Sequence, residues 1–263
     1  MPKARIDQAF DQVRIQGDKA FVPYIMAGDG GLAKLDEQLA FLEQAGATVV
    51  ELGIPFSDPV ADGPTIQEAG IRALKEGVSL QKVLDKLAES KENRDIPIVL
   101  MTYINPIYTF GVAEFAKACE ESGVDGLIIP DLPLEEESLV VESLRAHDIA
   151  LIRLAALTSP QARLEEIAKR TEGFLYAVTV TGTTGARIDF SDHVGTYLAQ
   201  LKEMSKAPVL AGFGVSTPEH VRSLSKHCDG VVVGSKIVDS LHAGDKQTIE
   251  TLIAASKNSV NVR

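Results

Sequence analysis

Two acidic side chains lie close together in the sequence, at places where carboxyl groups could move protons. Glu51 interrupts the apolar run Val49-Val50-Glu51-Leu52, and Asp62 stands in the segment Asp62-Gly63-Pro64 a little further on. Burial raises the pKa of a carboxyl group unless cations or donors compensate, and a raised pKa suits proton transfer near neutrality. Glu51 is thus either a proton-transfer group or a salt-bridged strand residue, and Asp62 is either its partner or an ordinary turn residue.

Glycines follow two later apolar runs and leave backbone amides free to bind an anion. Gly212 and Gly214 follow one run, and Gly234 and Ser235 follow the next. Amide groups in such loops, together with the start of a short helix, commonly bind phosphate at the end of a barrel. The alternative interpretation is a pair of tight turns that require positive φ.

A third segment of small residues, 179–187, contains Gly185 and follows another apolar run. Its composition suits a mobile lid over a phosphorylated substrate. A plain solvent loop has the same composition, so both interpretations stay open.

The elements that must position these residues are eight short apolar runs, too short for amphipathic helices. The runs are residues 21–26, 48–52, 98–103, 126–129, 150–154, 174–180, 209–211 and 230–233. Segments of helical period alternate with them, one of which covers 115–121 and stops at Gly123. Uncharged strands that alternate with helices indicate parallel pairing with helices on the outer face.

Eight such units predict a single (β/α)8 TIM barrel over residues 1–263, with an extra N-terminal helix and a short extra helix before the last helix. A doubly wound open sheet is the alternative, but the glycine cluster at 28–31 is weak evidence for its phosphate turn. The acidic residues 135–137 follow Pro133 and predict the solvated first turn of a helix, without a role in chemistry.

The composition disfavours several classes of function. The chain has 263 residues, 45% of them hydrophobic, and a formal net charge of −11, which repels nucleic acids and anionic membranes. Cys119 and Cys228 belong to no metal-binding or disulfide motif, and the five histidines show no ligand spacing. No run is long enough to span a bilayer, and residues 1–19 do not resemble a signal peptide. We therefore expect a cytoplasmic protein without a metal.

The segment ELGIPFSDPVADGP at 51–64 resembles the signature of the tryptophan synthase alpha subunits. Further matches follow in the order of that family: FVPYIMAG from Phe21, MTYINP from Met101, LIIPDLP from Leu127, AGFGVS from Ala211 and VGSK from Val233. The resemblance implies a lyase that cleaves indole-3-glycerol phosphate to indole and glyceraldehyde 3-phosphate by a retro-aldol reaction, in the last steps of L-tryptophan biosynthesis.

The resemblance also implies roles for individual residues. Glu51 becomes the acid/base that moves a proton between the glycerol hydroxyl and indole C3, and Asp62 the acceptor for the indole N–H. The expected substrate contacts are Tyr24, Met101, Ile128, Leu154, Tyr176 and Phe213, and the expected phosphate contacts are Gly185, Gly212, Gly214, Gly234 and Ser235.

No cofactor is implied for this chain. The implied partner is a beta subunit that carries pyridoxal phosphate and forms an alpha2beta2 tetramer with it. Pro55, Asp58 and Asn105 match positions at that contact. A stand-alone lyase that releases free indole, a different phosphate-handling barrel and a non-catalytic allosteric activator of a beta subunit are the alternatives. The paired carboxylates Glu51 and Asp62 argue against the last two.

Overall fold

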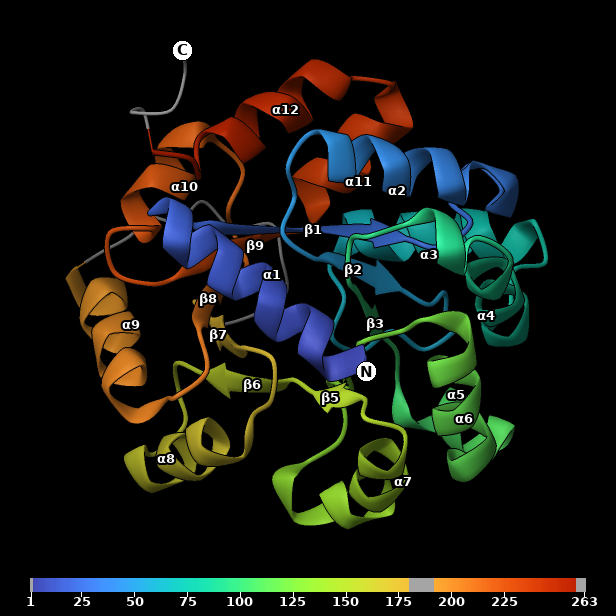
Figure 1. The fold of residues 1–263 in the computed structure, drawn as a ribbon, viewed down its shortest axis with the longest axis horizontal. Helices are drawn as coiled ribbons and strands as arrows, with labels where there is room; N and C mark the ends of the chain where they lie inside the picture. The colour runs from blue at the N-terminus through green and yellow to red at the C-terminus, as the bar shows by residue number, and fades with distance from the viewer. Residues whose placement is uncertain (1, 180–191, 259–263) are drawn as a thin grey trace.

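The computed structural model describes residues 2–179 and 192–258, and their strands form one parallel sheet that runs round a barrel (Figure 1). The strands are β1 (Ala20–Met26), β2 (Val50–Gly53), β3 (Ile98–Met101), β4 (Gly126–Ile128), β5 (Ala150–Leu151), β6 (Arg153–Ala156), β7 (Leu175–Val178), β8 (Val209–Gly212) and β9 (Gly230–Val233). Their order is β5-β4-β3-β2-β1-β9-β8-β7-β6, so the first and last strands are neighbours. The predicted TIM barrel is confirmed.

The fifth predicted strand differs from the expectation, because it is divided into β5 and β6 at Ile152. β5 pairs with β4, whereas β6 pairs with β7, so these consecutive segments join the two edges of the sheet. At the division, the backbone N–H of Arg153 donates to the hydroxyl of Thr171 instead of a neighbouring strand. The eight predicted runs therefore give nine strands but eight barrel positions.

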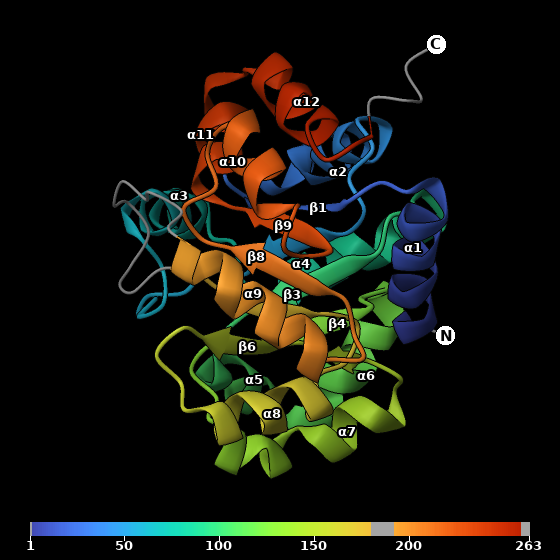
Figure 2. The same ribbon diagram turned by 90° about the vertical axis from the view of Figure 1, so that its left-hand side faces the viewer.

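Helices surround the barrel on its outer face and cover one of its ends (Figures 1 and 2). They are α1 (Pro2–Gln16), α2 (Leu35–Gln44), α3 (Pro64–Lys75), α4 (Leu80–Glu89), α5 (Ile104–Phe110), α6 (Val112–Ser122), α7 (Val141–Ala146), α8 (Gln161–Arg170), α9 (Asp192–Met204), α10 (Pro218–Leu224), α11 (Ser235–Ala243) and α12 (Lys246–Ala254), with 3-10 turns η1 (Leu32–Lys34), η2 (Lys91–Asn93) and η3 (Leu134–Leu139). As predicted, α6 ends where Gly123 adopts the left-handed conformation at φ 71°.

The two extra helices of the prediction are α1 and α11. Figure 2 shows α1 across one end of the barrel. Its apolar residues Ile6, Phe10 and Val13 join the buried cluster inside the strands, which closes the amino-terminal end of the barrel. α11 precedes the last helix and begins directly after β9. The opposite, carboxyl-terminal end of the strands is left to build a site.

Two apolar layers result from the alternation of side chains along the strands. One cluster fills the barrel interior and includes Val22, Val99 and Leu210, while the larger one lies between the strands and the surrounding helices. In the part of the chain that the structure describes, no helix is long and apolar enough to cross a membrane.

Candidate active site

Glu51 is the second residue of β2, and its side chain lies inside the barrel. It pairs in register with Tyr24 of β1 and Val99 of β3, and only 1% of the residue is exposed. Strand alternation directs it to the same face as Val49, which belongs to the interior cluster. The strand therefore buries a carboxyl group where the carboxyl ends of the barrel strands converge.

The surroundings of Glu51 do not offset its burial. Among the described residues, its Oε2 atom has no hydrogen-bond partner. Burial, followed by the negative charge of Asp62, raises the pKa of Glu51 to about 8. A carboxyl group in this state carries a proton at neutral pH and can donate it, which favours the proton-transfer interpretation over the salt-bridge interpretation.

Asp62 belongs to the loop between β2 and α3 and is itself buried. Burial raises its pKa to about 6, although a hydrogen-bonding interaction with the Tyr103 hydroxyl opposes the rise. Its backbone is fixed as well, because Asp62 N donates to Pro59 O at 3.0 Å and Gln67 Nε2 donates to Asp62 O at 2.8 Å. At neutral pH the site thus holds a protonated Glu51 beside an ionised Asp62.

Two tyrosines share this site with the carboxyl groups. Tyr24 and Tyr176 are buried, and burial together with the charges of Glu51 and Asp62 raises the pKa of each phenol well above its ordinary value. Glycines give both rings room: a Cβ at Gly53 would collide with the Tyr24 hydroxyl, and one at Gly212 would collide with the Tyr176 ring. Both phenols therefore stay neutral and available as hydrogen-bonding groups.

The apolar residues expected around the indole ring lie on the same interior surface. Met101 pairs with Ile128, and Leu154 pairs with Tyr176. Phe213 meets Tyr176 edge to face, with ring centroids 5.9 Å apart. Ile128 is fully buried, while Met101, Leu154 and Phe213 are half-buried. The structure brings these candidates together near the carboxyl groups, but their contact with substrate stays a prediction.

The expected phosphate contacts lie at two neighbouring strand ends. Gly212 ends β8, while Gly234 precedes α11 and Ser235 begins it. Gly214 has a φ of 75°, and the hydroxyl of Thr179 donates to Gly212 O at 2.7 Å, which ties the end of β7 to the glycine loop. The first amides of α11 have no acceptor within their helix and carry its positive dipole end.

The remaining predicted positions are the phosphate contact Gly185 and the three expected partner contacts. Gly185 lies outside the described residues, as do residues 180–187 of the segment interpreted as either a mobile lid or a plain solvent loop. Asp58 and Asn105 are exposed, as a partner contact requires, whereas Pro55 is buried. All three stay predictions as contacts with a partner.

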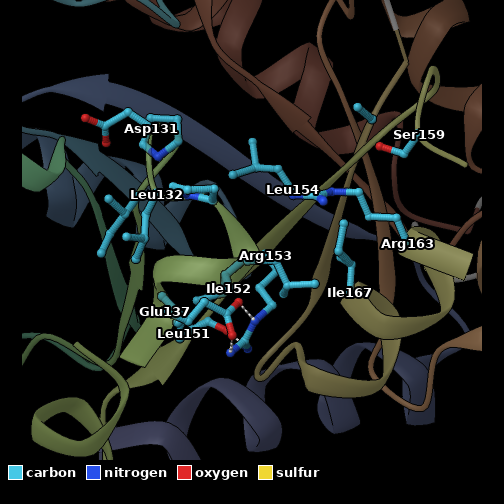
Figure 3. Close-up of a pocket in the computed structure, with 15 residues that line it drawn as sticks. Asp131, Leu132, Glu137, Leu151, Ile152, Arg153, Leu154, Ser159, Arg163 and Ile167 are labelled. Atoms are coloured by element: carbon cyan, nitrogen blue, oxygen red, sulfur yellow. Dashed lines mark hydrogen bonds and ion pairs between the residues drawn. The ribbon is translucent and has the colours of Figure 1, made fainter. Parts of the chain in front are cut away.

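A separate pocket of about 470 Å³ opens between the loop after β4 and the start of α8 (Figure 3). Leu154 lines it, but Glu51 and Asp62 do not.

The expectation of a solvated first turn for residues 135–137 is wrong at Glu137. This residue is buried and bound to Arg153, with Arg153 Nη2 and Glu137 Oε2 2.9 Å apart. The preceding residues remain solvated, and a long-range partner on β6 explains the exception.

Tyr103 is the site residue that sequence reasoning missed. Its hydroxyl accepts the backbone N–H of Ala61 at 3.1 Å and interacts with the Asp62 carboxylate. A signal was present, because Tyr103 ends the third apolar run, where barrel residues with functions are expected.

No group of three or more histidine, cysteine, aspartate or glutamate side chains that could hold a metal occurs in residues 2–179 and 192–258. The fold and the site define a class of protein: a (β/α)8 barrel with a buried pair of carboxyl groups, Glu51 and Asp62, and with glycines where two neighbouring strands end.

Comparison with known proteins identifies the family within that class. The family model of the tryptophan synthase alpha chain matches residues 10–262. The alpha chain of Oceanobacillus iheyensis is 56% identical over 256 residues, which are 97% of this chain and 98% of that relative. An alpha chain of Bacillus cereus is 51% identical over 253 residues, 96% of each chain.

Solved structures agree with this result. A chain of Mycobacterium tuberculosis tryptophan synthase has a TM-score of 0.89 and 30% identity, with 97% of this chain and 99% of that chain covered. A chain of the tryptophan synthase a2b2 complex from Pyrococcus furiosus has a TM-score of 0.83 and 40% identity, with 90% and 98% covered. The protein belongs to the tryptophan synthase alpha chain family.

Proposed function

We propose that this protein is the lyase of the alpha reaction, which cleaves indole-3-glycerol phosphate to indole and glyceraldehyde 3-phosphate in tryptophan biosynthesis. The observation that carries the proposal is the buried pair Glu51 and Asp62, whose pKa values of about 8 and about 6 lie on either side of neutrality. A retro-aldol cleavage of this substrate requires one group that protonates indole C3 and another that holds the indole N–H.

Glu51 supplies the first proton in this mechanism. The protonated carboxyl group transfers its proton to indole C3, and the nitrogen lone pair forms the N1–C2 double bond. Asp62 accepts the N–H proton, which leaves the neutral indolenine. The Glu51 carboxylate produced in this step is then the base for the next.

Cleavage restores both carboxyl groups to their starting states. The Glu51 carboxylate removes the hydroxyl proton from the carbon of the substrate's glycerol phosphate chain that is bonded to indole C3. A carbonyl forms at that carbon as its bond to C3 breaks. The bonding electrons return to the indole ring, and N1 regains its proton from Asp62. Protons and electrons balance, so no external oxidant or reductant is required.

The rest of the substrate has matching surfaces. The indole ring would lie against Met101, Ile128, Leu154 and Phe213, beside Tyr24 and Tyr176. The phosphate would bind the amides at Gly212, Gly214, Gly234 and Ser235, whose strand ends adjoin. Gly185 is proposed as a further phosphate contact.

We also propose a partner. It is a tryptophan synthase beta subunit that carries pyridoxal phosphate, accepts the indole and forms an alpha2beta2 tetramer with this chain, with Pro55, Asp58 and Asn105 near the contact. In this scheme the chain needs no cofactor of its own. We propose that the complex is cytoplasmic. The Pyrococcus furiosus neighbour, described by its a2b2 complex, supports the partnership.

The deciding experiment measures indole release from indole-3-glycerol phosphate by the purified chain, with and without a beta subunit. Slow release that accelerates with the beta subunit supports the proposal. Fast release that the beta subunit leaves unchanged favours the stand-alone lyase. No release under either condition, with ligand binding retained, favours a non-catalytic activator.

A further inference from the structure

Tyr103 connects two loops at the carboxyl end of the barrel. It precedes α5 directly, after β3, and is only 2% exposed. Its ring stacks on Phe56 of the β2 loop, with centroids 5.2 Å apart and planes 29° from parallel. A single side chain from the third strand end thus holds the loop that carries Asp62.

The hydroxyl of Tyr103 has two different partners in that loop. It accepts the backbone N–H of Ala61 at 3.1 Å, which leaves its own proton for another acceptor. The carboxylate of Asp62, the next residue in the chain, is that acceptor. Because one hydroxyl binds the backbone before Asp62 and also interacts with the side chain of Asp62, it is placed to hold both the loop and the carboxylate.

We propose that Tyr103 is a positioning residue for the reaction, and that its hydroxyl orients the Asp62 carboxylate toward the indole N–H. The kinetic part of this inference rests on the proposed function. Tyr103 needs no contact with the reacting atoms, because the Asp62 carboxylate transmits its effect.

The position of Tyr103 is in turn fixed by the neighbouring loop. Ile104, the first residue of α5, donates its backbone N–H to Asp131 Oδ1 at 3.0 Å. The backbone N–H of Thr102 donates to Ile128 O at 3.1 Å. Tyr103 is therefore held from both sides by the end of β4 and its loop, as an orienting group must be.

The charges at the site predict how loss of the Tyr103 hydroxyl would change the pKa of Asp62. The titratable groups that face Asp62 are Glu51, Tyr24, Tyr103 and Tyr176. A donor to a carboxylate stabilises its charged form, so its removal raises the pKa of Asp62 from about 6. The difference from Glu51 then becomes smaller, and less of the enzyme holds the productive combination of one acid and one base.

The test compares Tyr103→Phe, which keeps the ring stacked on Phe56, with Tyr197→Phe. Tyr197 is a matched control, because it is also buried and donates its hydroxyl proton to a protein oxygen, Ala155 O at 2.6 Å, outside the site. The measurements are kcat and KM for indole release, the pH profile of kcat/KM, the thermal midpoint, and the titration of the Asp62 carboxyl carbon by NMR, assigned with Asp62→Asn.

For Tyr103→Phe we expect kcat to fall roughly 10- to 100-fold, the range for a lost hydrogen bond to a charged group, with a smaller change in KM. The acid limb of the pH profile and the NMR titration of Asp62 should both move to higher pH. Tyr197→Phe should lower the thermal midpoint without either shift.

Unchanged kcat and an unchanged Asp62 titration in Tyr103→Phe would overturn the inference. So would a loss of activity no larger than the unfolded fraction explains, with the titration unmoved. A wild-type chain that releases no indole would instead contradict the proposed function, and the NMR titration would still decide whether Tyr103 orients Asp62.

Discussion

Glu51 and Asp125 are two buried carboxyl groups at opposite ends of the same barrel. Asp125, just before β4, is 0% exposed, and both of its oxygens accept from Arg5 Nη1 at 3.0 Å. Its Oδ2 also accepts the backbone N–H of Ile98 at 2.8 Å. Glu51 is almost as buried, at 1% exposed, yet its Oε2 lacks any partner among the described residues.

The difference in partners changes the charge of the two groups. Burial is the largest cause of a raised pKa in both, but Arg5 and the Ile98 amide hold the pKa of Asp125 to about 6, whereas that of Glu51 reaches about 8. At neutral pH Asp125 is ionised and Glu51 is protonated. Burial alone therefore does not distinguish Glu51 from Asp125, whereas the absence of compensating partners does.

The comparison predicts its largest effect for Glu51→Gln. Loss of a general acid/base should reduce turnover by roughly 100- to 10,000-fold. The free energy of unfolding should not fall, because glutamine is neutral and close in shape to the protonated side chain. Indole release and urea unfolding at neutral pH measure the two quantities. Full activity in the variant would remove Glu51 from the mechanism.

The matched change at the other end of the barrel, Asp125→Asn, should have the opposite pattern. It leaves an acceptor for Ile98 but removes the charge opposite Arg5, whose side chain is 31% exposed. We expect a loss of no more than about 1 kcal/mol in unfolding free energy, because the raised pKa of Asp125 means that its charge costs the folded chain some stability, and the neutral asparagine removes that cost together with the ion pair. Turnover per folded molecule should be unchanged, and a specific loss of kcat would contradict the structural role.

The pH dependence of stability should separate the two groups further. A folded-state pKa above the unfolded value means that the folded chain binds the extra proton, so stability falls as pH rises between the two values. The window for Glu51 runs from 4.5 to about 8, and that for Asp125 from 3.8 to about 6.

Urea unfolding across pH 4–9 therefore distinguishes the variants. The stability of Glu51→Gln relative to the wild type should continue to rise above pH 6 and level off near pH 8. The relative stability of Asp125→Asn should be flat above pH 6. If the relative stability of both variants had the same pH dependence, the environments of Glu51 and Asp125 would be equivalent.

The smallest effect is expected for an exposed carboxylate. Asp11 pairs with Arg14 within α1 at 2.8 Å, and both side chains are mostly exposed. Asp11→Asn should change the free energy of unfolding by about 0.5 kcal/mol or less, and sodium chloride should reduce the difference. A cost as large as that of Asp125→Asn would mean that burial has no part in the comparison.

The barrel could be predicted because its strands are continuous apolar runs, and parallel strands covered by helices have no polar face. Glu51 could be predicted for the same reason, since it is a charged residue inside such a run. The lack of a hydrogen-bond partner for the Glu51 Oε2 atom could not be predicted, because such partners come from other strands. The same limit applies to Arg153, which begins β6 and binds Glu137 from η3.

Tyr103 shows the limit most directly. Its place at the end of an apolar run was visible, but its two partners lie in the loop of another strand, and only their geometry distinguishes an orienting hydroxyl from a packed phenol. Residue types at strand ends therefore predict the carboxyl pair, while the groups that orient the pair require the structure.

The pairing of β1 with β9 has a consequence for how the chain folds during synthesis. Ala20 lies beside Gly230, so the ring closes between segments that leave the ribosome far apart in time. β2, which carries Glu51, already has β3 as a neighbour, but the β1 edge stays open until β9 arrives. The nascent barrel must keep that edge from pairing with other chains for most of its translation, and its slowest folding step is expected to be this closure.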